Sequence, residues 1–157
     1  MLERRTFLKC CLGAGAFIAL PSFARAVVEK LIKTNDEWKK LLTPAQYNIL
    51  REEGTEQPGS SALLSEHRPG IFHCVACDLA LFDSKTKFES GTGWPSFYDH
   101  LPGALETKTD RLLGFARTEY HCARCGGHHG HVFDDGPKPT GLRYCSNGAV
   151  LKFNLKG

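Results

Sequence analysis

The sequence predicts a mainly β domain of antiparallel strands, with short helices confined to its N-terminal part. From Gly70 onward the chain is a series of short β-prone segments separated by turn residues, and no helical stretch lies between them. Because parallel strands need a long crossover connection, usually a helix, this pattern argues against a parallel α/β sheet. The 157 residues are sufficient for one domain with a buried core.

Two short helices are expected before the β region. Asn35 or Asp36 is a suitable cap for the first helix. The run Thr43-Pro44-Ala45-Gln46 is a stronger start signal, because it joins a Thr cap, a proline at the first helical position and a glutamine three residues after the cap. Gly54 should end this second helix, and residues 55–69, rich in Gly, Pro and Ser, should form a loop.

The expected strands are short runs rich in β-branched and aromatic residues, bounded by turn residues. Alternation of apolar and polar side chains is clearest in the last of them. The candidates are Gly70–Cys74, Leu79–Asp83, Thr86–Ser90, Ala104–Thr107, Leu112–Cys122, Gly130–Asp134, Leu142–Asn147 and Ala149–Leu155.

The first 26 residues are predicted to be an export signal. Paired arginines at positions 4 and 5 precede an apolar stretch from about Cys10 to Leu20, and Ala24-Arg25-Ala26 has the small-x-small pattern of a cleavage site. The start resembles the twin-arginine signal of bacteria. This predicts a signal peptide at 1–26, a mature domain at 27–157, a periplasmic location and no stable membrane insertion after cleavage. An ordinary secretion signal or an uncleaved anchor is the alternative.

The positive net charge of the chain belongs to this leader. The chain has 20 basic and 17 acidic residues, and the leader contains four of the former and one of the latter. The remainder is therefore balanced, with a formal net charge of zero. A neutral domain gives no electrostatic reason to expect nucleic acid as a partner. We expect a monomer.

Four cysteines form two Cys-x-x-Cys pairs, Cys74 with Cys77 and Cys122 with Cys125. Each pair follows a predicted strand, so two such knuckles can complete a tetrahedron of thiolates around one zinc ion. All four positions would be filled by sulfur, which makes the role of the zinc structural. Disulfides and thioredoxin-like redox pairs are the alternatives, although a redox pair needs a following helix that the sequence does not predict.

Cys145 is the one cysteine outside both the leader and these pairs. In a strand, Arg143, Cys145 and Asn147 would face one way, and Tyr144 and Ser146 the other. A guanidinium beside a thiol favours the thiolate and lowers the thiol pKa, so Cys145 is a candidate nucleophile. A buried structural cysteine is the alternative, but arginine and asparagine are poor core neighbours.

Three histidines, His128, His129 and His131, lie within four positions and indicate acid–base chemistry or a second metal site. In an extended chain His131 and Asp135 share a face, and His128 joins them only if the chain bends. His129 is the first candidate for a merely solvated side chain.

The glycine-rich loop Ser90–Phe97 places two aromatic residues, Trp94 and Phe97, close together. Gly93 permits an unusual backbone conformation, and Pro95 stiffens the end of the loop. Such a loop can form an apolar cradle for a small group. Ordinary core packing of Trp94 is an equally good interpretation.

Taken together, several motifs in this order resemble the methionine-R-sulfoxide reductase B family. They are Leu42-Thr43-Pro44, Gly54-Thr55-Glu56, Cys74-x-x-Cys77, Ser90–Phe97, Cys122-x-x-Cys125, Gly130–Pro137 and Arg143-Tyr144-Cys145-x-Asn147. The resemblance implies two antiparallel sheets pinned by zinc, a fold often called a β-tent. It also implies an oxidoreductase, a peptide-methionine (R)-S-oxide reductase, acting on oxidised proteins or on free methionine-R-sulfoxide.

The resemblance also implies roles for the candidate residues. Cys145 would attack the sulfoxide sulfur and become a sulfenic acid, and Trp94 would hold the terminal methyl group. The polar substrate-binding and acid–base positions would be His128, His131, Asp135, Arg143 and Asn147. We expect His131 to be the chief proton donor, and Phe97 to contribute to the substrate site.

Thr92 departs from the pattern of many family members, which carry a second, resolving cysteine at this position. An external thiol, thioredoxin-like or other, is therefore the expected reductant. There are two smaller departures. The chain has Pro58-Gly59-Ser60 where the family often has Pro-Phe-Ser, and it has Gly148 where the family usually has serine. Two rival functions remain open from the sequence: a zinc module that binds a protein without catalysis, and a different thiol-based reductase on the same scaffold.

Overall fold

The protein was analysed as a computed structural model, which describes residues 28–111 and 114–157. The helices are α1 (Asn35–Leu41) and α2 (Pro44–Glu52), with 3-10 turns η1 (Ala62–Ser65), η2 (Ser84–Thr86) and η3 (Gly148–Val150). The strands are β1 (Gly70–Cys74), β2 (Ala80–Asp83), β3 (Lys87–Phe88), β4 (Ser96–Phe97), β5 (Leu105–Asp110), β6 (Arg117–Cys122), β7 (His128–Phe133), β8 (Arg143–Ser146) and β9 (Leu151–Leu155).

Both helices begin with a capping box. Thr43 caps α2 with Pro44 behind it and Gln46 reaching back to the Thr43 backbone, as predicted. The first helix is capped one residue earlier than expected, by Thr34, because Glu37 stands three residues after Thr34 and can complete the box. The prediction of Asn35 or Asp36 as the cap was therefore wrong.

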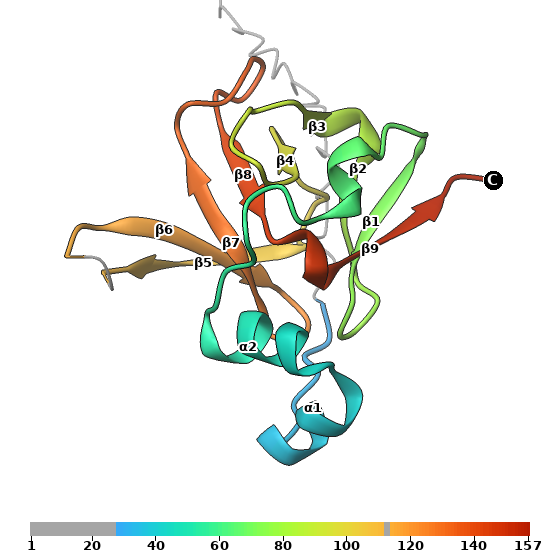
Figure 1. Cartoon of the computed structure of the whole chain (residues 1–157), viewed down its shortest axis with the longest axis vertical. Coiled ribbons are helices and arrows are strands. Elements are labelled where there is room, and N and C mark those ends of the chain that lie inside the picture. Colours follow the sequence, from blue (N-terminus) through green and yellow to red (C-terminus); the bar gives the residue numbers. More distant parts are fainter. Residues whose placement is uncertain (1–27, 112–113) are drawn as a thin grey trace, which may run out of the picture.

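The strands form two antiparallel sheets, as predicted (Figure 1). The smaller sheet has the order β2-β1-β9, and the larger has the order β3-β4-β8-β7-β6-β5. The two helices lie together at one end of the molecule, with α2 next to β7 (Figure 1). Among the described residues, no helix is long and apolar enough to cross a membrane.

Aromatic side chains from both sheets form the core. Phe82 of β2 stacks on Phe97 of β4 with ring centroids 4.2 Å apart, and Phe72 of β1 meets Phe97 edge-on at 4.9 Å. Tyr120 of β6 and Tyr144 of β8 pack edge-to-face at 5.5 Å. Such pairs stabilise the fold beyond the area they bury, and they bind the two sheets together.

Most predicted strands are found with their ends shifted by one to three residues, and two larger differences remain. The predicted strand at Leu112–Cys122 begins only at Arg117, and residues 112–113 are not described. The short strand β4, Ser96–Phe97, was not predicted at all. It lies inside the glycine-rich loop, and its two residues form a strand because they pair with β8 on one side and β3 on the other.

The predicted export signal, residues 1–26, lies outside the described residues and stays a prediction.

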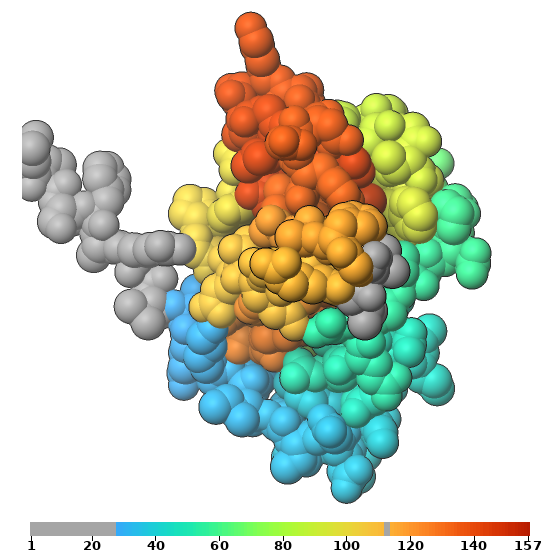
Figure 2. Space-filling model, turned by 90° about the vertical axis from the view of Figure 1, so that its left-hand side faces the viewer, coloured from blue at the N-terminus to red at the C-terminus, as the bar shows by residue number. Residues whose placement is uncertain are grey.

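The folded part presents a face on which the β5–β6 hairpin lies across the molecule (Figure 2). The N-terminal segment with α1 borders this hairpin on one side, and the segment that follows β7 borders it on the other (Figure 2).

Candidate active site

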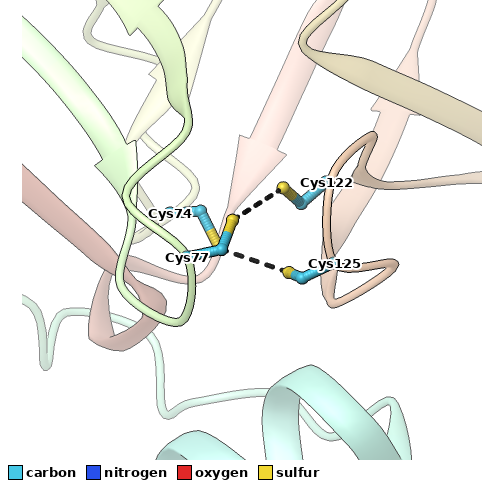
Figure 3. A group of neighbouring side chains, drawn as sticks. All are labelled: Cys74, Cys77, Cys122 and Cys125. Atoms are coloured by element: carbon cyan, nitrogen blue, oxygen red, sulfur yellow. Dashed lines mark hydrogen bonds between the residues drawn. The ribbon is translucent and has the colours of Figure 1, made fainter. Parts of the chain in front are cut away.

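The four paired cysteines converge at one point between the sheets (Figure 3). Cys74 and Cys77 flank the turn after β1, and Cys122 and Cys125 flank the turn between β6 and β7. Their sulfur atoms all lie within 4.8 Å of one another. In each knuckle the residue after the second cysteine has a positive φ, 61° at Asp78 and 67° at Gly126, which is what so tight a turn requires.

The sulfur geometry fits a tetrahedral metal ion. The Sγ atoms of Cys77 and Cys122 are 3.5 Å apart, and those of Cys74 and Cys125 are 3.7 Å apart. Four sulfurs at the usual zinc–sulfur distance of about 2.3 Å would be about 3.8 Å apart. Each of these two short sulfur–sulfur distances joins a cysteine of one Cys-x-x-Cys pair to a cysteine of the other pair. The disulfide alternative does not fit, because all five described cysteines are free thiols.

A second site lies on the larger sheet, around Cys145. A pocket of about 140 Å³ opens there, large enough for one side chain of moderate size. Its lining comes from the loop after α2, the glycine-rich loop and strands β6, β7 and β8. The lining residues are Thr55, Trp94, Arg117, Gly130, His131, Phe133, Cys145, Ser146 and Asn147.

Strand register places ionisable side chains in one row across this sheet. Lys108 of β5 pairs with Glu119 of β6, Glu119 pairs with His131 of β7, and His131 pairs with Cys145 of β8. Directly opposed residues in antiparallel strands point to the same face. The row therefore runs from a surface lysine to the thiol, with His131 beside Cys145.

His131 is held by an acidic neighbour that the sequence analysis did not identify. Its Nε2 lies 2.8 Å from Oδ2 of Asp110, at the end of β5. The Arg117 guanidinium donates to the same Asp110 oxygen at 2.5 Å. Burial lowers the pKa of His131, and the hydrogen bond to Asp110 opposes that shift by stabilising the imidazolium.

The other two histidines are buried at the inner end of β7. The pairing of β6 with β7 shifts its register after Tyr120, and this irregularity supplies the bend that His128 needed to join His131. The centroid of the His128 ring lies 5.4 Å from that of the His131 ring. His128 Nδ1 is 3.0 Å from the buried Glu119 carboxylate. His129 was expected to be solvated, which was wrong: it is fully buried, and burial lowers its pKa to about 3, so its ring is neutral.

Burial decides the state of the Cys145 thiol. It raises the pKa of Cys145 above the ordinary value, while the charge of Arg143 and hydrogen bonds from Thr92 and Arg143 lower it. The sequence predicted a net lowering, and this was wrong because burial outweighs the arginine and Asp135 offsets its charge. The Asp135 carboxylate accepts two hydrogen bonds from Arg143, at 2.7 and 2.8 Å. Burial of the thiol therefore disfavours its thiolate form.

The remaining candidates divide between the pocket and its surroundings. Trp94 and Asn147 line the pocket. Arg143 and Asp135 do not; they form an ion pair beside it, and Arg143 stacks on Phe133 at 4.3 Å. Phe97 belongs to the aromatic core and is fully buried, because β4 turns this residue inward. The prediction that Phe97 contacts substrate is not supported by this position.

Four residues near the pocket were missed by the sequence analysis: Thr55, Asp110, Arg117 and Glu119. A signal existed for the last two, since Arg117 and Glu119 alternate with Thr118 in a predicted strand and would share a face. Thr55 belongs to the Gly54-Thr55-Glu56 motif, which the resemblance included without giving this residue a role, and Asp110 lies in a segment with no pattern that relates it to Cys145.

This fold and pocket define a β protein with a four-cysteine centre and a separate thiol site. The sequence profile of the SelR domain matches residues 42–155. A peptide methionine sulfoxide reductase MsrB of Pseudomonas entomophila is 53% identical over 125 residues, which span 79% of this chain and 95% of the relative. The corresponding protein of Leptospira interrogans is 53% identical over 122 residues, 77% of this chain and 93% of that protein.

Peptide methionine sulfoxide reductase B1 of Arabidopsis thaliana, chloroplastic, is 52% identical over 122 residues, 77% of this chain and 60% of its own length. Among solved structures, the Yippee-like domain of Mis18 aligns with a TM-score of 0.46 at 20% identity, over 57% of this chain and 99% of that domain. The profile and the relatives make the assignment: the chain belongs to the methionine-R-sulfoxide reductase B family.

Replacing Asp110 should change the proton affinity of His131. In Asp110→Asn the carboxylate that stabilises the imidazolium is gone, so the pKa of His131 should fall further below its ordinary value. An NMR titration of the His131 ring should show its midpoint at lower pH than in the wild type. Asp134→Asn is the control, because Asp134 is solvent-exposed and screened. An unchanged His131 midpoint in Asp110→Asn would contradict the assigned role.

Proposed function

We propose that this protein reduces the R epimer of methionine sulfoxide in oxidised proteins, with Cys145 as the nucleophile. The observation that carries the proposal is the position of Cys145 in the lining of a pocket of about 140 Å³, which Trp94 and His131 also line. Membership of the family supports methionine sulfoxide reduction, and the relatives are named as peptide methionine sulfoxide reductases. A protein-bound substrate is therefore the natural choice.

The reaction needs one transfer of oxygen. The Cys145 sulfur attacks the sulfoxide sulfur, the oxygen is protonated, and the oxygen moves to the Cys145 sulfur as the thioether leaves. The products are methionine and a sulfenic acid, Cys–SOH, so the sulfoxide is reduced and the thiol oxidised. Burial disfavours the thiolate of Cys145, so the thiol must lose its proton before or during attack, since the thiolate is the nucleophile.

The neighbours of Cys145 suit these steps. His131 lies opposite it in the strand register and is the proposed proton donor to the oxygen. Trp94 offers an aromatic face to the methyl group, and Asn147 offers an amide to the polar end of the substrate. His128, beside His131, and the Arg143–Asp135 pair are proposed to support this geometry from outside the pocket.

Zinc is proposed to occupy the four-cysteine centre in a structural role. The four thiolates of Cys74, Cys77, Cys122 and Cys125 would fill the coordination shell, leaving no position for substrate. One knuckle ends β1 in the smaller sheet, and the other joins β6 to β7 in the larger sheet. A metal ion there would fix the inner end of β7, which carries the histidines.

An external thiol is proposed to reduce the sulfenic acid. Among the described residues, the other four cysteines face one another in the metal centre and none lines the pocket. Thr92 stands where the family resemblance implies a resolving cysteine in many members. It lies close enough to Cys145 to lower the pKa of that thiol, and its hydroxyl hydrogen-bonds to that of Ser90 at 2.8 Å. Two equivalents of an external thiol would return Cys145 to the thiol with release of water.

Reduction should be confined to one epimer and should require Cys145. The wild type should turn over a peptide containing the R sulfoxide and leave the S sulfoxide unchanged. Cys145→Ser should lose at least about 10³-fold in kcat/KM, because the hydroxyl is a far weaker nucleophile than the thiolate. Chromatography of each epimer separately provides the measurement. Equal turnover of both epimers, or an active Cys145→Ser, would refute the proposal.

Oxidised enzyme should accumulate as a sulfenic acid when no reductant is present. After one turnover, mass spectrometry should find one added oxygen on the Cys145 peptide, and dimedone should trap it. Thr92→Cys is the matched variant: its new thiol, adjacent to Cys145, should instead form an internal disulfide. An internal disulfide to Cys145 in the wild type would exclude reduction by an external thiol as the first step.

Loss of one zinc ligand should release the metal and destabilise the fold. Purified wild type should contain about one zinc ion per chain by elemental analysis. Cys122→Ser should lose the metal and unfold at a markedly lower temperature, since metal binding contributes directly to folding. Cys145→Ser is the control and should keep both zinc and thermal midpoint. Metal-free wild type with an unchanged midpoint would rule out the structural role.

A further inference from the structure

We propose that Glu56 is a positioning residue of the active site, which holds the side chains of Trp94 and Asn147 in place in the pocket that contains Cys145. Glu56 lies in the loop that follows α2, outside the sheet that carries Cys145. It makes hydrogen bonds through its carboxylate, its backbone N–H and its backbone carbonyl, and every one reaches a segment of the site. The inference rests on the proposed function and adds a residue to it.

The carboxylate anchors Glu56 to the chain just beyond Cys145. Its Oε1 accepts the backbone N–H of Gly148 at 2.5 Å, and its Oε2 accepts that of Ala149 at 2.9 Å. These two amides begin η3, the single 3-10 turn that follows β8, and Asn147 makes no side-chain cap for it. Glu56 thus supplies from a distant loop the acceptor that this turn lacks, with charge-assisted hydrogen bonds.

The backbone of Glu56 then fixes the two pocket residues. Its N–H donates to Oδ1 of Asn147 at 3.0 Å, and its carbonyl accepts the Trp94 indole N–H at 3.2 Å. The Asn147 amide also donates from Nδ2 to the carbonyl of His129 at 3.0 Å. Both ends of that amide are therefore held. The Trp94 indole is held through its N–H, which is its one polar group.

The surrounding loop is fitted closely to this arrangement. A Cβ on Gly148 would come within 2.0 Å of the Ser61 hydroxyl, and a Cβ on Gly93 would come within 2.8 Å of Pro58. Gly59 also donates its N–H to the carbonyl of Gly93 at 2.7 Å. The segment around Glu56 therefore contacts both the glycine-rich loop before Trp94 and the turn after Asn147.

Glu56 itself does not line the catalytic pocket; its neighbour Thr55 does. Its effect on the reaction must therefore pass through Trp94 and Asn147. The groups that set the state of Cys145 are others, namely Arg143, Thr92 and Asp135. Removing the Glu56 side chain should thus disturb substrate positioning while leaving the thiol chemically unchanged. A general loss of structure would disturb both.

The test compares three measurements on Glu56→Ala in the full-length protein. Turnover of an R-sulfoxide peptide should fall at least about tenfold in kcat/KM. The rate of iodoacetamide alkylation of Cys145, followed by mass spectrometry of its peptide, should stay within about twofold of wild type. Acrylamide quenching of tryptophan fluorescence should increase, and it reports on Trp94 because the other tryptophan, Trp38, is 1% exposed.

Two further variants complete the design. Glu66→Ala is the matched control, since Glu66 lies in the same loop but pairs with Arg68; all three measurements should equal those of wild type. Glu56→Gln keeps one acceptor oxygen and should retain an intermediate kcat/KM, and it replaces Glu56→Ala in the test if that variant does not fold.

Two results would overturn the inference. One is a wild-type kcat/KM with wild-type quenching in the Glu56 variants. The other is a parallel fall of turnover, alkylation rate and thermal midpoint, which would mean that Glu56 only stabilises the fold. An inactive wild type would instead count against the proposed function, so the two failures are distinguishable.

Discussion

The register of β7 against β8 is the constraint on which the site depends. It places His131 opposite Cys145, and the neighbouring register places Glu119 opposite His131. A slip of one residue would turn every side chain of the strand to the other face. Gly130 helps to fix this register, because a Cβ there would lie 1.9 Å from the Cys145 carbonyl oxygen. Only glycine allows β7 to lie so close to β8.

The same register gives β8 one face in the aromatic core and one face in the pocket. Tyr144 faces the aromatic core and packs against Tyr120 and Phe82, while Cys145 faces the pocket. The Tyr120 hydroxyl reaches Ser146 at 2.5 Å, which ties the core to the residue after the thiol. The thiol is therefore carried by a strand whose position is set by packing, and a preorganised site on a rigid element is the arrangement that precise chemistry needs.

Local patterns in the sequence were sufficient for both helices and for eight of the nine strands, although not for their exact ends. The Thr43 capping box, the two Cys-x-x-Cys pairs and the alternation through Arg143 and Cys145 all concern neighbours along the chain. The features that could not be predicted depend on distant pairing. Strand β4 exists only because β3 and β8 lie beside it, and Asp110 meets His131 only through the register of β5, β6 and β7. Burial is equally non-local, which is why the solvation of His129 and the state of Cys145 were misjudged.

Burial and the groups around Cys145 act on its pKa in opposite directions. A protonated sulfur is a poor target for oxidants, since reactivity follows thiolate character. Burial raises the pKa of Cys145, whereas Arg143 and Thr92 lower it. The Asp135 carboxylate, which is paired with Arg143, offsets part of the effect of the arginine charge. Substrate entering the pocket would meet a thiol whose ionisation depends on small changes among these few groups.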